Sequence, residues 1–318
     1  QFYKAAQGSD LIVYHPKAFG APDIAETLGI RCVNLPPIPA TYPITEFPNP
    51  ALVTTRNLGP RLNKLTYTLM KQAESASIKE VNDFRVKTLG LPKRKTGAYT
   101  YVAGGREIPI VYPLSTQLFP DVTSWQDKVY LPGFFFLDGA AESLDPQARE
   151  FVEAGSPPVV VSFSSLPLKD PAGFGQMLRD ALQRSGNRAV VLLGSSGMSF
   201  PHCPEILAIP GAPHSALFPL AKGILHHGGI GTLAAALKSG KPQLIMPFAV
   251  DQPFWAAQMY RLGLAGAPLD EKKLTGEALA QAFLQFDSNE MISKAAEIGR
   301  AVAAEDGTGA ALAYLENV

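Results

Sequence analysis

Short apolar runs and longer segments with helical spacing alternate along the second half of the chain. The apolar runs are four or five residues long, the size of buried strands, and the segments between them repeat apolar residues every three or four positions. We expect strands at 159–162, 189–193, 206–209, 223–226 and 243–246, and helices at 174–185, 214–220, 232–239 and 252–262. Strands that alternate with helices predict right-handed crossovers and a parallel, doubly wound sheet.

The first half is less regular but begins in the same way. Strands are expected at 10–14, 31–35 and 108–112, with a helix at 18–28 between the first two. Two further helices are expected in this half, at 62–74 and 78–89. At the end of the chain, helices are expected at 274–286, 291–304 and 310–315. Residues 36–50 carry six prolines and cannot form regular structure, so this stretch is predicted to be a loop over a site.

Prolines also interrupt residues 113–158, and a connection between two domains is expected there. We therefore predict an α/β protein with two Rossmann-like, doubly wound domains, the first of which is incomplete. The predicted division is 1–125 for the first domain, 126–154 for the connection, and 155–318 for the second domain with its C-terminal helices. Residues 1–9 have the character of a helix end, so the chain is expected to begin within a domain.

The composition narrows the choice of partners. Lysine plus arginine equals aspartate plus glutamate at 28 each, so there is neither a basic excess for nucleic acid nor an acidic tail. The two cysteines, Cys32 and Cys203, are too few for a disulfide framework and favour a reducing, cytoplasmic compartment. No apolar run approaches the length that crosses a bilayer. The expectation is a soluble protein whose partner is a small molecule.

The segment with the strongest chemical signal runs from His226 to Thr232 and contains Gly229, Ile230 and Gly231. It lies where an expected strand ends and a helix begins, the place at which open α/β sheets bind ligands. Glycines allow close backbone approach and a helix N-terminus attracts anions, so a phosphate is the expected occupant. Thr232 and His226 would add hydrogen-bond donors. The alternative is that the glycines serve only tight packing and that the histidines are satisfied locally.

The same turn also fits a dinucleotide fingerprint. Residues 229–234, Gly-Ile-Gly-Thr-Leu-Ala, satisfy the pattern G-x-G-x-x-A, and Asp251 follows about 20 residues later. A NAD(P)-dependent oxidoreductase is therefore an alternative. Two features weigh against it, because Asp251 stands beyond Pro247 rather than at a strand tip, and several strands precede this turn within its domain.

Asp251 and Gln252 follow the next expected strand, so their loop opens at the same sheet edge as the glycine turn. A carboxylate and an amide side by side suit a sugar ring, since each sugar hydroxyl both donates and accepts hydrogen bonds. The alternative is that Asp251 only caps the helix that begins at Gln252.

These segments resemble the donor-binding signature of the GT-B glycosyltransferases of family 1. Within that family the sequence of these segments is most like that of the sterol glucosyltransferases and of the bacterial enzymes that glycosylate macrocyclic antibiotics. The matching segments are 212–214, 225–232, 240–242, 247–248 and 251–252, with further similar wording at 82–92, 132–138 and 157–165. The resemblance implies a GT-B fold, in which two Rossmann-like domains face a cleft, with 1–125 as a truncated acceptor-binding domain and 155–318 as the donor-binding domain.

The resemblance also assigns roles to residues of the second domain. It implies that the diphosphate is held by His226, Gly229, Ile230, Gly231, Thr232 and Ser164 or Ser165, the nucleobase by Ala212 and His214, and the sugar by Asp251 and Gln252. Family members carry Phe-Gly-Ser where this chain has Phe163-Ser164-Ser165. The serine side chain that replaces the glycine could crowd the phosphate.

The acceptor side is defined by fewer residues. An inverting transferase needs a general base to take the proton of the attacking hydroxyl, and the resemblance implies that this base lies before Gln1. His15, at the end of an expected strand, would orient that base, act as the base itself, or line the pocket. Tyr42 and Phe47 are expected to form an apolar wall for the acceptor.

The expected function is that of a metal-independent, inverting hexosyltransferase. It would move a hexose from a UDP- or dTDP-sugar to a hydroxyl of a sterol, lipid or polyketide, and such an acceptor is compatible with peripheral contact with a membrane. No Asp-x-Asp pair occurs in the sequence, so no metal and no cofactor are expected, and the nucleotide sugar is a co-substrate. The alternatives that stay open are the oxidoreductase and a donor-binding protein without activity.

Overall fold

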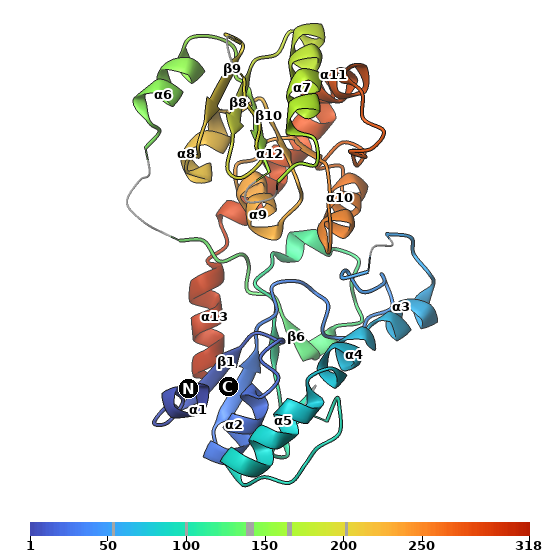
Figure 1. Cartoon of the computed structure of the whole chain (residues 1–318), viewed down its shortest axis with the longest axis vertical. Helices are drawn as coiled ribbons and strands as arrows, with labels where there is room; N and C mark the ends of the chain where they lie inside the picture. Colours follow the sequence, from blue (N-terminus) through green and yellow to red (C-terminus); the bar gives the residue numbers. More distant parts are fainter. Residues whose placement is uncertain (53–54, 99–100, 138–142, 164–166, 201–202) are drawn as a thin grey trace. The chain divides into compact units, whose positions relative to one another are not determined.

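The computed structural model describes residues 1–52, 55–98, 101–137, 143–163, 167–200 and 203–318. The chain divides into two compact units (Figure 1). Unit 1 consists of Gln1–Phe136 together with Glu305–Val318, and unit 2 consists of Leu137–Ala304. Each unit is built on its own parallel sheet.

Unit 2 contains a five-stranded sheet in which all neighbouring strands are parallel. Its strands are β7 (Val159–Ser162), β8 (Ala189–Leu192), β9 (Ile206–Ile209), β10 (Gly223–His226) and β11 (Gln243–Ile245). Their spatial order is β11-β10-β7-β8-β9, so the direction in which the chain winds reverses between β7 and β10. In doubly wound sheets ligands bind at such a switch point.

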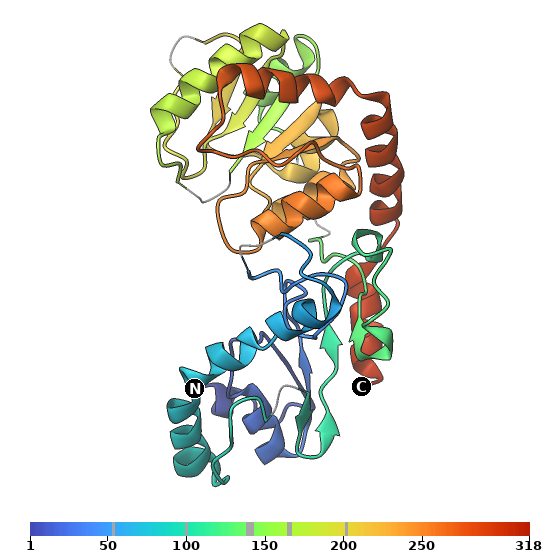
Figure 2. The same ribbon diagram turned by 90° about the vertical axis from the view of Figure 1, so that its right-hand side faces the viewer.

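Helices cover both faces of this sheet (Figure 2) because successive strand residues point to opposite sides. Val159 and Val161 pack with the helices α7 and α11, whereas Val160 packs with α6, α8 and α9. The helices of unit 2 are α6 (Pro146–Glu153), α7 (Pro171–Ser185), α8 (His214–Leu217), α9 (Ile230–Lys238), α10 (Gln252–Arg261), α11 (Gly276–Leu284) and α12 (Asn289–Ala303). Strand β7, with the sequence Val-Val-Val-Ser, is therefore buried on both faces, as is typical of strands in parallel sheets.

Unit 1 contains a smaller parallel sheet of order β1-β2-β5-β6 and a separate two-stranded hairpin. The strands are β1 (Leu11–Tyr14), β2 (Arg31–Asn34), β5 (Ile110–Val111), β6 (Val129–Tyr130), and the hairpin strands β3 (Val102–Ala103) and β4 (Arg106–Glu107). The helices are α1 (Phe2–Ala5), α2 (Ala21–Leu28), α3 (Pro60–Thr66), α4 (Leu69–Ser75), α5 (Ile78–Phe84) and α13 (Gly307–Glu316). A π-helical turn at Arg85–Leu89 continues α5.

A buried network of charges joins the helices of unit 1. Asp23 of α2 is fully buried and forms ion pairs with Arg85 and with Arg94, the latter at 2.9 Å. Arg94 also pairs with Glu74 of α4 and donates a hydrogen bond to the Phe19 carbonyl at 3.0 Å. Since a buried charge is costly unless it is paired, this network fixes α2, α4 and the end of α5 relative to one another.

The predicted strands of unit 2 and the α/β class are confirmed, with boundaries that agree to within a residue or two. The single helix predicted at 62–74 is instead two helices, α3 and α4, because the chain turns at Tyr67 and Thr68. The short strand β6 was not predicted, since two residues carry no periodicity.

The boundaries of the two compact units differ from those of the predicted domains 1–125, 126–154 and 155–318. Unit 1 ends at Phe136 and resumes at Glu305. The last helix, α13, belongs to unit 1, where Tyr314 stacks on Tyr130 with ring centroids 4.6 Å apart. Helical periodicity identifies the apolar face of this helix but does not reveal which sheet that face covers.

Truncation of Asp23 tests the buried charge network. We expect Asp23→Ala to lower the free energy of unfolding of unit 1 by about 3–5 kcal/mol, because two buried guanidinium groups lose a partner. The sequence contains two tryptophans, of which Trp125 lies in unit 1, so a Trp255→Phe background makes fluorescence in a urea titration report unit 1 alone. The control is Asp83→Ala, which removes only the exposed pair with Lys87, and equal destabilisation by both changes would contradict this account.

Candidate functional site

The candidate site lies at the switch point of the unit 2 sheet. Strands β7 and β10 are neighbours there, and their last residues, Ser162 and His226, are paired in register. On the other side of β10, His226 is paired with Ile245 at the end of β11. Because all these strands are parallel, the loops that follow them open at one edge of the sheet.

Two glycines shape the turn from β10 into α9. Gly228 has a φ of +87°, and a Cβ atom at this position would lie 2.9 Å from the Ile245 Cγ2 atom. A Cβ atom on Gly229 would lie 2.3 Å from Nε2 of His227. The first position therefore needs glycine for its backbone conformation, and the second needs it to leave room for the imidazole ring. Together they let α9 begin directly beside the end of β10.

The N-terminus of α9 is open to a ligand. Among the residues that the structure describes, no side chain caps this helix and no acidic residue stands in its first turn. Its first backbone hydrogen bond runs from the Leu233 N–H to the Gly229 carbonyl at 2.9 Å. The N–H groups of Ile230, Gly231 and Thr232 precede that bond, so they are the donors that a helix N-terminus leaves without an intrahelical acceptor. Such a group of donors attracts an anion.

His226 occupies a different position from the one predicted. The residue is fully buried, and its Nδ1 accepts a hydrogen bond from the Gly228 N–H at 3.1 Å. Nε2 therefore carries the proton of the neutral ring and donates it to Oε1 of Gln243 at 2.8 Å. Burial lowers the pKa of His226 to about 3, so the ring carries no charge near neutral pH. Both ring nitrogens are engaged inside the protein, which leaves His226 without a free donor for the diphosphate contact predicted for it.

His227 is the histidine with unused hydrogen-bonding capacity. Its side chain is 6% exposed, and its Nδ1 atom is buried without a hydrogen-bond partner among the described residues. Burial lowers the pKa of His227, and an interaction with the Ser162 backbone and the charge of Asp251 offset part of that effect. A buried polar atom without a partner is unfavourable, which points to a ligand that would supply one.

The loop after β11 holds the two predicted sugar-binding residues in defined orientations. Asp251 stands at the N-cap position of α10 but makes no capping hydrogen bond there; its Oδ2 instead accepts from the Trp255 Nε1–H at 2.7 Å. Oε1 of Gln252 accepts from the backbone N–H groups of Phe248 and Ala249 at 2.8 and 3.1 Å. The alternative that Asp251 is only a helix cap is therefore wrong, and Gln252 retains its amide N–H groups for a ligand.

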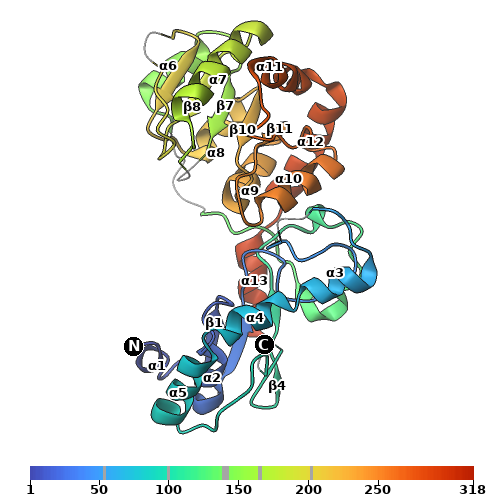
Figure 3. The same ribbon diagram turned by 45° about the vertical axis from the view of Figure 1, so that its right-hand side comes forward.

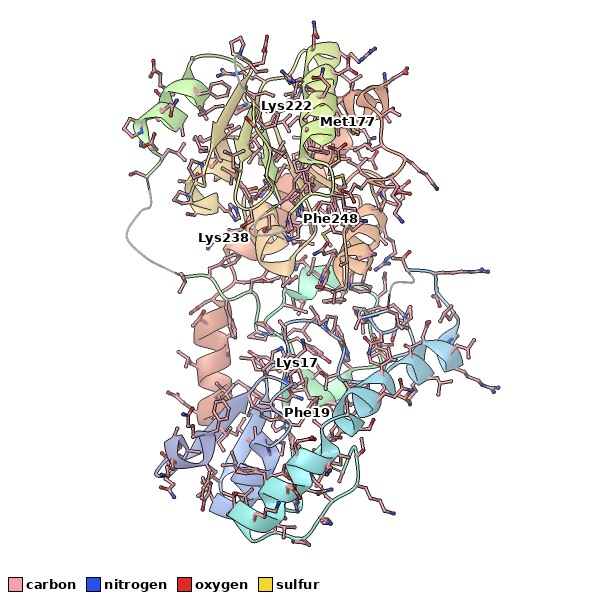
Figure 4. The ribbon with its side chains drawn as sticks, in the orientation of Figure 1. Lys17, Phe19, Met177, Lys222, Lys238 and Phe248 are labelled. Atoms are coloured by element: carbon pink, nitrogen blue, oxygen red, sulfur yellow. The ribbon has the colours of Figure 1, made fainter. Side chains whose placement is uncertain are left out.

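The same loop is fixed by packing on one side and strained on the other. The Phe248 ring (labelled in Figure 4) meets the buried Phe163 ring, which follows β7, with centroids 5.5 Å apart. Val250 adopts a φ of +56°, which is uncommon for a β-branched residue, and its side chain is 58% exposed. Strained backbone of this kind is found most often at functional sites.

The predicted nucleobase residues lie at the same sheet edge, after β9. His214 begins α8, and its ring stacks on Phe218 with centroids 4.2 Å apart. Burial and the neighbouring His227 lower the pKa of His214, so these two rings lie close enough to interact electrostatically. Ala212 packs against the hydrophobic core beneath this loop. Ser164 and Ser165, the other predicted phosphate residues, lie outside the described residues.

The predicted acceptor-side residues lie in unit 1, each in different surroundings. His15 is exposed after β1, and its Nδ1 accepts a hydrogen bond at 3.1 Å from the backbone N–H of Lys17, the residue labelled in Figure 4. Tyr42 lines a cavity of about 220 Å³ and packs edge-on against Tyr101. Phe47 belongs instead to an aromatic cluster, where its ring lies 6.0 Å from Phe119 and 6.5 Å from Trp125.

The geometry of the glycine turn does not match a dinucleotide-binding unit. The turn follows β10, and three strands of the same sheet precede it in the chain. Asp251 begins α10 instead of ending a strand, and its carboxylate is hydrogen-bonded to Trp255. The acidic residue of the fingerprint is therefore not at the strand tip where it would meet a ribose.

The His226–Gln243 pair makes the stability of unit 2 sensitive to acid. Because the pKa of His226 falls from about 6.5 in the unfolded chain to about 3 in the folded one, its stabilising contribution is complete above pH 6.5 and lost as the pH falls toward 3. In a Trp125→Phe background, urea unfolding followed by Trp255 fluorescence should show stability falling by up to about 1.4 kcal/mol per pH unit from this residue. His226→Gln should flatten the dependence, and identical pH slopes for both proteins would contradict the assignment.

Comparisons with known proteins agree with this geometry. Residues 193–310 match the family described as erythromycin biosynthesis protein CIII-like, C-terminal domain. A sterol 3-beta-glucosyltransferase of Arabidopsis thaliana, UGT80A2, is 32% identical over 320 residues, which cover 98% of this chain and 49% of the relative. A sterol 3-beta-glucosyltransferase of Yarrowia lipolytica is 29% identical over 98% of this chain and 22% of the relative. The chain thus spans about half the length of the plant relative and less than a quarter of the length of the Yarrowia lipolytica relative.

Solved structures resemble the chain over nearly its whole length. The glycosyltransferase of kitacinnamycin superposes with a TM-score of 0.74 at 20% identity, covering 99% of this chain and 78% of that one. The calicheamicin glycosyltransferase CalG4 gives a TM-score of 0.68 at 17% identity, covering 99% and 75%. The predicted fold class is confirmed by these neighbours. The chain therefore has the GT-B fold, and over nearly its whole length it is similar to a part of the sterol 3-beta-glucosyltransferases.

Proposed function

We propose that this chain is the nucleotide-sugar-binding part of a metal-independent glycosyltransferase that transfers a hexose, with inversion, from a UDP- or dTDP-sugar to a hydroxyl of a hydrophobic acceptor. The observation that carries the proposal is the uncapped N-terminus of α9, which follows His227, whose Nδ1 has no hydrogen-bond partner among the described residues. The nucleotide sugar is a co-substrate, and no further cofactor is required. We place the protein in the cytoplasm, where the free thiols of Cys32 and Cys203 stay reduced.

The diphosphate would lie against the N-terminus of α9. Three backbone N–H groups from Ile230 to Thr232 are available there, and the helix dipole adds positive potential. A neutral His227 with its proton on Nδ1 would add one more donor. These groups are fixed before the reaction starts, so they can stabilise the negative charge that develops on the leaving diphosphate.

The sugar would be held by Asp251 and Gln252, which offer complementary groups. The Asp251 carboxylate accepts hydrogen bonds from sugar hydroxyls, and Trp255 fixes its orientation. Gln252 is held through its carbonyl oxygen and offers its amide N–H groups to the sugar oxygens. The nucleobase would lie against Ala212 and His214. A solved neighbour, UGT2 of Phytolacca americana, is described as a complex with UDP-2-fluoro-glucose and pterostilbene, which supports a UDP-sugar and a hydrophobic acceptor.

The acceptor would be a hydroxyl compound of the sterol, lipid or polyketide kind, and the names of the relatives favour a sterol. We assign His15 to the acceptor side as a hydrogen-bond donor. Its Nδ1 lone pair accepts from the Lys17 N–H, so the neutral ring carries its proton on Nε2, which is a donor and has no lone pair to accept the hydroxyl proton. The general base is therefore a group other than His15 in this tautomer. Tyr42 contributes an aromatic wall to a cavity on this side.

A single added charge at Gly231 tests the diphosphate site. A Cβ atom there meets no other atom within 4 Å, so Gly231→Asp and Gly231→Asn should both fold. The aspartate suits the helix dipole but repels a diphosphate, whereas the asparagine is similar in size and uncharged. By isothermal titration calorimetry we expect the aspartate to weaken UDP binding at least about tenfold relative to the asparagine.

Equal UDP affinities of the two Gly231 variants would refute diphosphate binding at α9. Wild-type protein that binds NADH and not UDP would revive the oxidoreductase alternative in place of the transferase.

Asp251→Asn tests the sugar site separately from the nucleotide site. Asparagine keeps a side-chain oxygen for the Trp255 Nε1–H but removes the charge offered to the sugar. We expect UDP affinity to be unchanged and UDP-glucose affinity to fall by about tenfold or more, because hydrogen bonds to charged groups are the stronger ones. A parallel loss for UDP would assign Asp251 to the loop structure and not to the sugar.

A further inference from the structure

Helix α3 of unit 1 is attached to the protein through its polar side. Asn63 is its fully buried residue, and the Asn63 Nδ2 group donates hydrogen bonds to the Thr45 carbonyl and to Asn57 Oδ1, both at 2.8 Å. Thr66 adds a second polar anchor, since its hydroxyl accepts from the Asn49 N–H at 2.8 Å. Amphipathic helices of globular proteins usually bury their apolar side. In α3 the arrangement is reversed.

Away from Asn63, α3 (labelled in Figure 3) carries leucines that are exposed to solvent. Leu62 and Leu65, three positions apart and hence on one face, are 54% and 60% exposed, and Leu58 before the helix is 36% exposed. Two neighbouring exposed leucines on one helix face are unusual, because scattered single apolar residues are the norm on protein surfaces. We call residues 56–65 the leucine–arginine surface.

The charge on this surface has one sign. From Phe47 to Ala73 the sequence contains Arg56, Arg61, Lys64 and Lys71 and no acidic residue. Arg61 and Lys64 are exposed, and Arg61 neighbours Leu62 at the border of the leucine face. A leucine face bordered by cations therefore complements a surface that is apolar beneath and negative at its boundary.

The acidic residue that precedes this segment is bound to another part of unit 1. Glu46 is partly buried, and its Oε1 accepts hydrogen bonds from the backbone N–H groups of Thr123 and Ser124, both at 3.0 Å. These bonds and the Ser124 hydroxyl lower the pKa of Glu46 to about 2 although desolvation by burial acts in the opposite direction. The carboxylate thus ties the proline-rich loop to the 119–125 segment and is committed inside unit 1.

We propose that the leucine–arginine surface docks on a membrane that carries anionic lipids. The leucines would enter the boundary between headgroups and acyl chains, and the arginine and lysine side chains would meet the lipid phosphates. None of the helices in the described residues has the length and apolar character to cross a bilayer, so the contact is peripheral. The inference rests on this surface and not on the transferase activity, but it would bring unit 1 to the phase in which a sterol-like acceptor is dissolved.

Vesicle co-sedimentation of the full chain tests the proposal. The probes are phosphatidylcholine vesicles without phosphatidylserine and the same vesicles with about 30% phosphatidylserine, which gives a clear negative surface potential. We expect binding to the anionic vesicles that falls steeply in high salt, and about tenfold or more weaker binding to the neutral ones. Equal binding to both vesicles, or no binding, would overturn the proposal.

Two variant pairs locate the contact. Leu62→Gln with Leu65→Gln, and separately Arg61→Glu with Lys64→Glu, should each reduce binding about tenfold or more. The control pair is Leu284→Gln with Leu312→Gln, which removes leucines that are 46% and 58% exposed on other helices and should leave binding unchanged. All three pairs should keep the UDP affinity of the wild type, which separates this inference from the proposed function.

If the Leu62/Leu65 pair binds anionic vesicles as well as the wild type does, α3 is not the membrane contact. If the wild type ignores vesicles but forms a dimer in solution that this pair abolishes, the surface serves a second copy of the chain, and the membrane proposal is wrong.

Discussion

The close approach of backbone to side chain at Gly228 and Gly229 is the constraint on which the site depends. Any Cβ atom at either glycine would collide, with Ile245 at the first position and with the His227 ring at the second. Because both positions are glycine, α9 can start immediately after β10, and its unpaired N–H groups face the sheet edge at the switch point. The proposed anion site would therefore be formed by the backbone before any charged side chain contributes.

The two adjacent histidines of this turn, His226 and His227, have different environments. His226 is inside, where it links β10 to β11 through Gln243 and holds the Gly228 N–H, so that the turn has one conformation. His227 follows the end of β10, and its Nδ1 has no hydrogen-bond partner in the described part of the chain. The same logic applies in the next loop, where Trp255 and the backbone at Phe248 orient Asp251 and Gln252. Groups that are held in place by the protein need little reorganisation when a ligand arrives.

Much of this arrangement follows from the sequence, because strand and helix periods and glycine punctuation are local properties. The turn at 226–232, its position at a strand end and the fold class are all read from such patterns. The choice between His226 and His227 is not local. It depends on Gln243, a partner on a neighbouring strand that engages Nε2 of His226. The outward leucines of α3 likewise depend on the hydrogen bonds of Asn63, which no helical period reveals.

The account is tested most directly by following the histidine side chains during ligand binding. The sequence contains five histidines, so ¹⁵N-histidine labelling gives a spectrum simple enough to assign with single His→Gln variants. On titration with UDP, the ring nitrogens of His227 should shift, while His226 should keep the signature of a neutral ring protonated on Nε2 across the titration. A shift confined to His226, or no response of His227 at saturating UDP, would contradict the claim that the diphosphate is held at the start of α9.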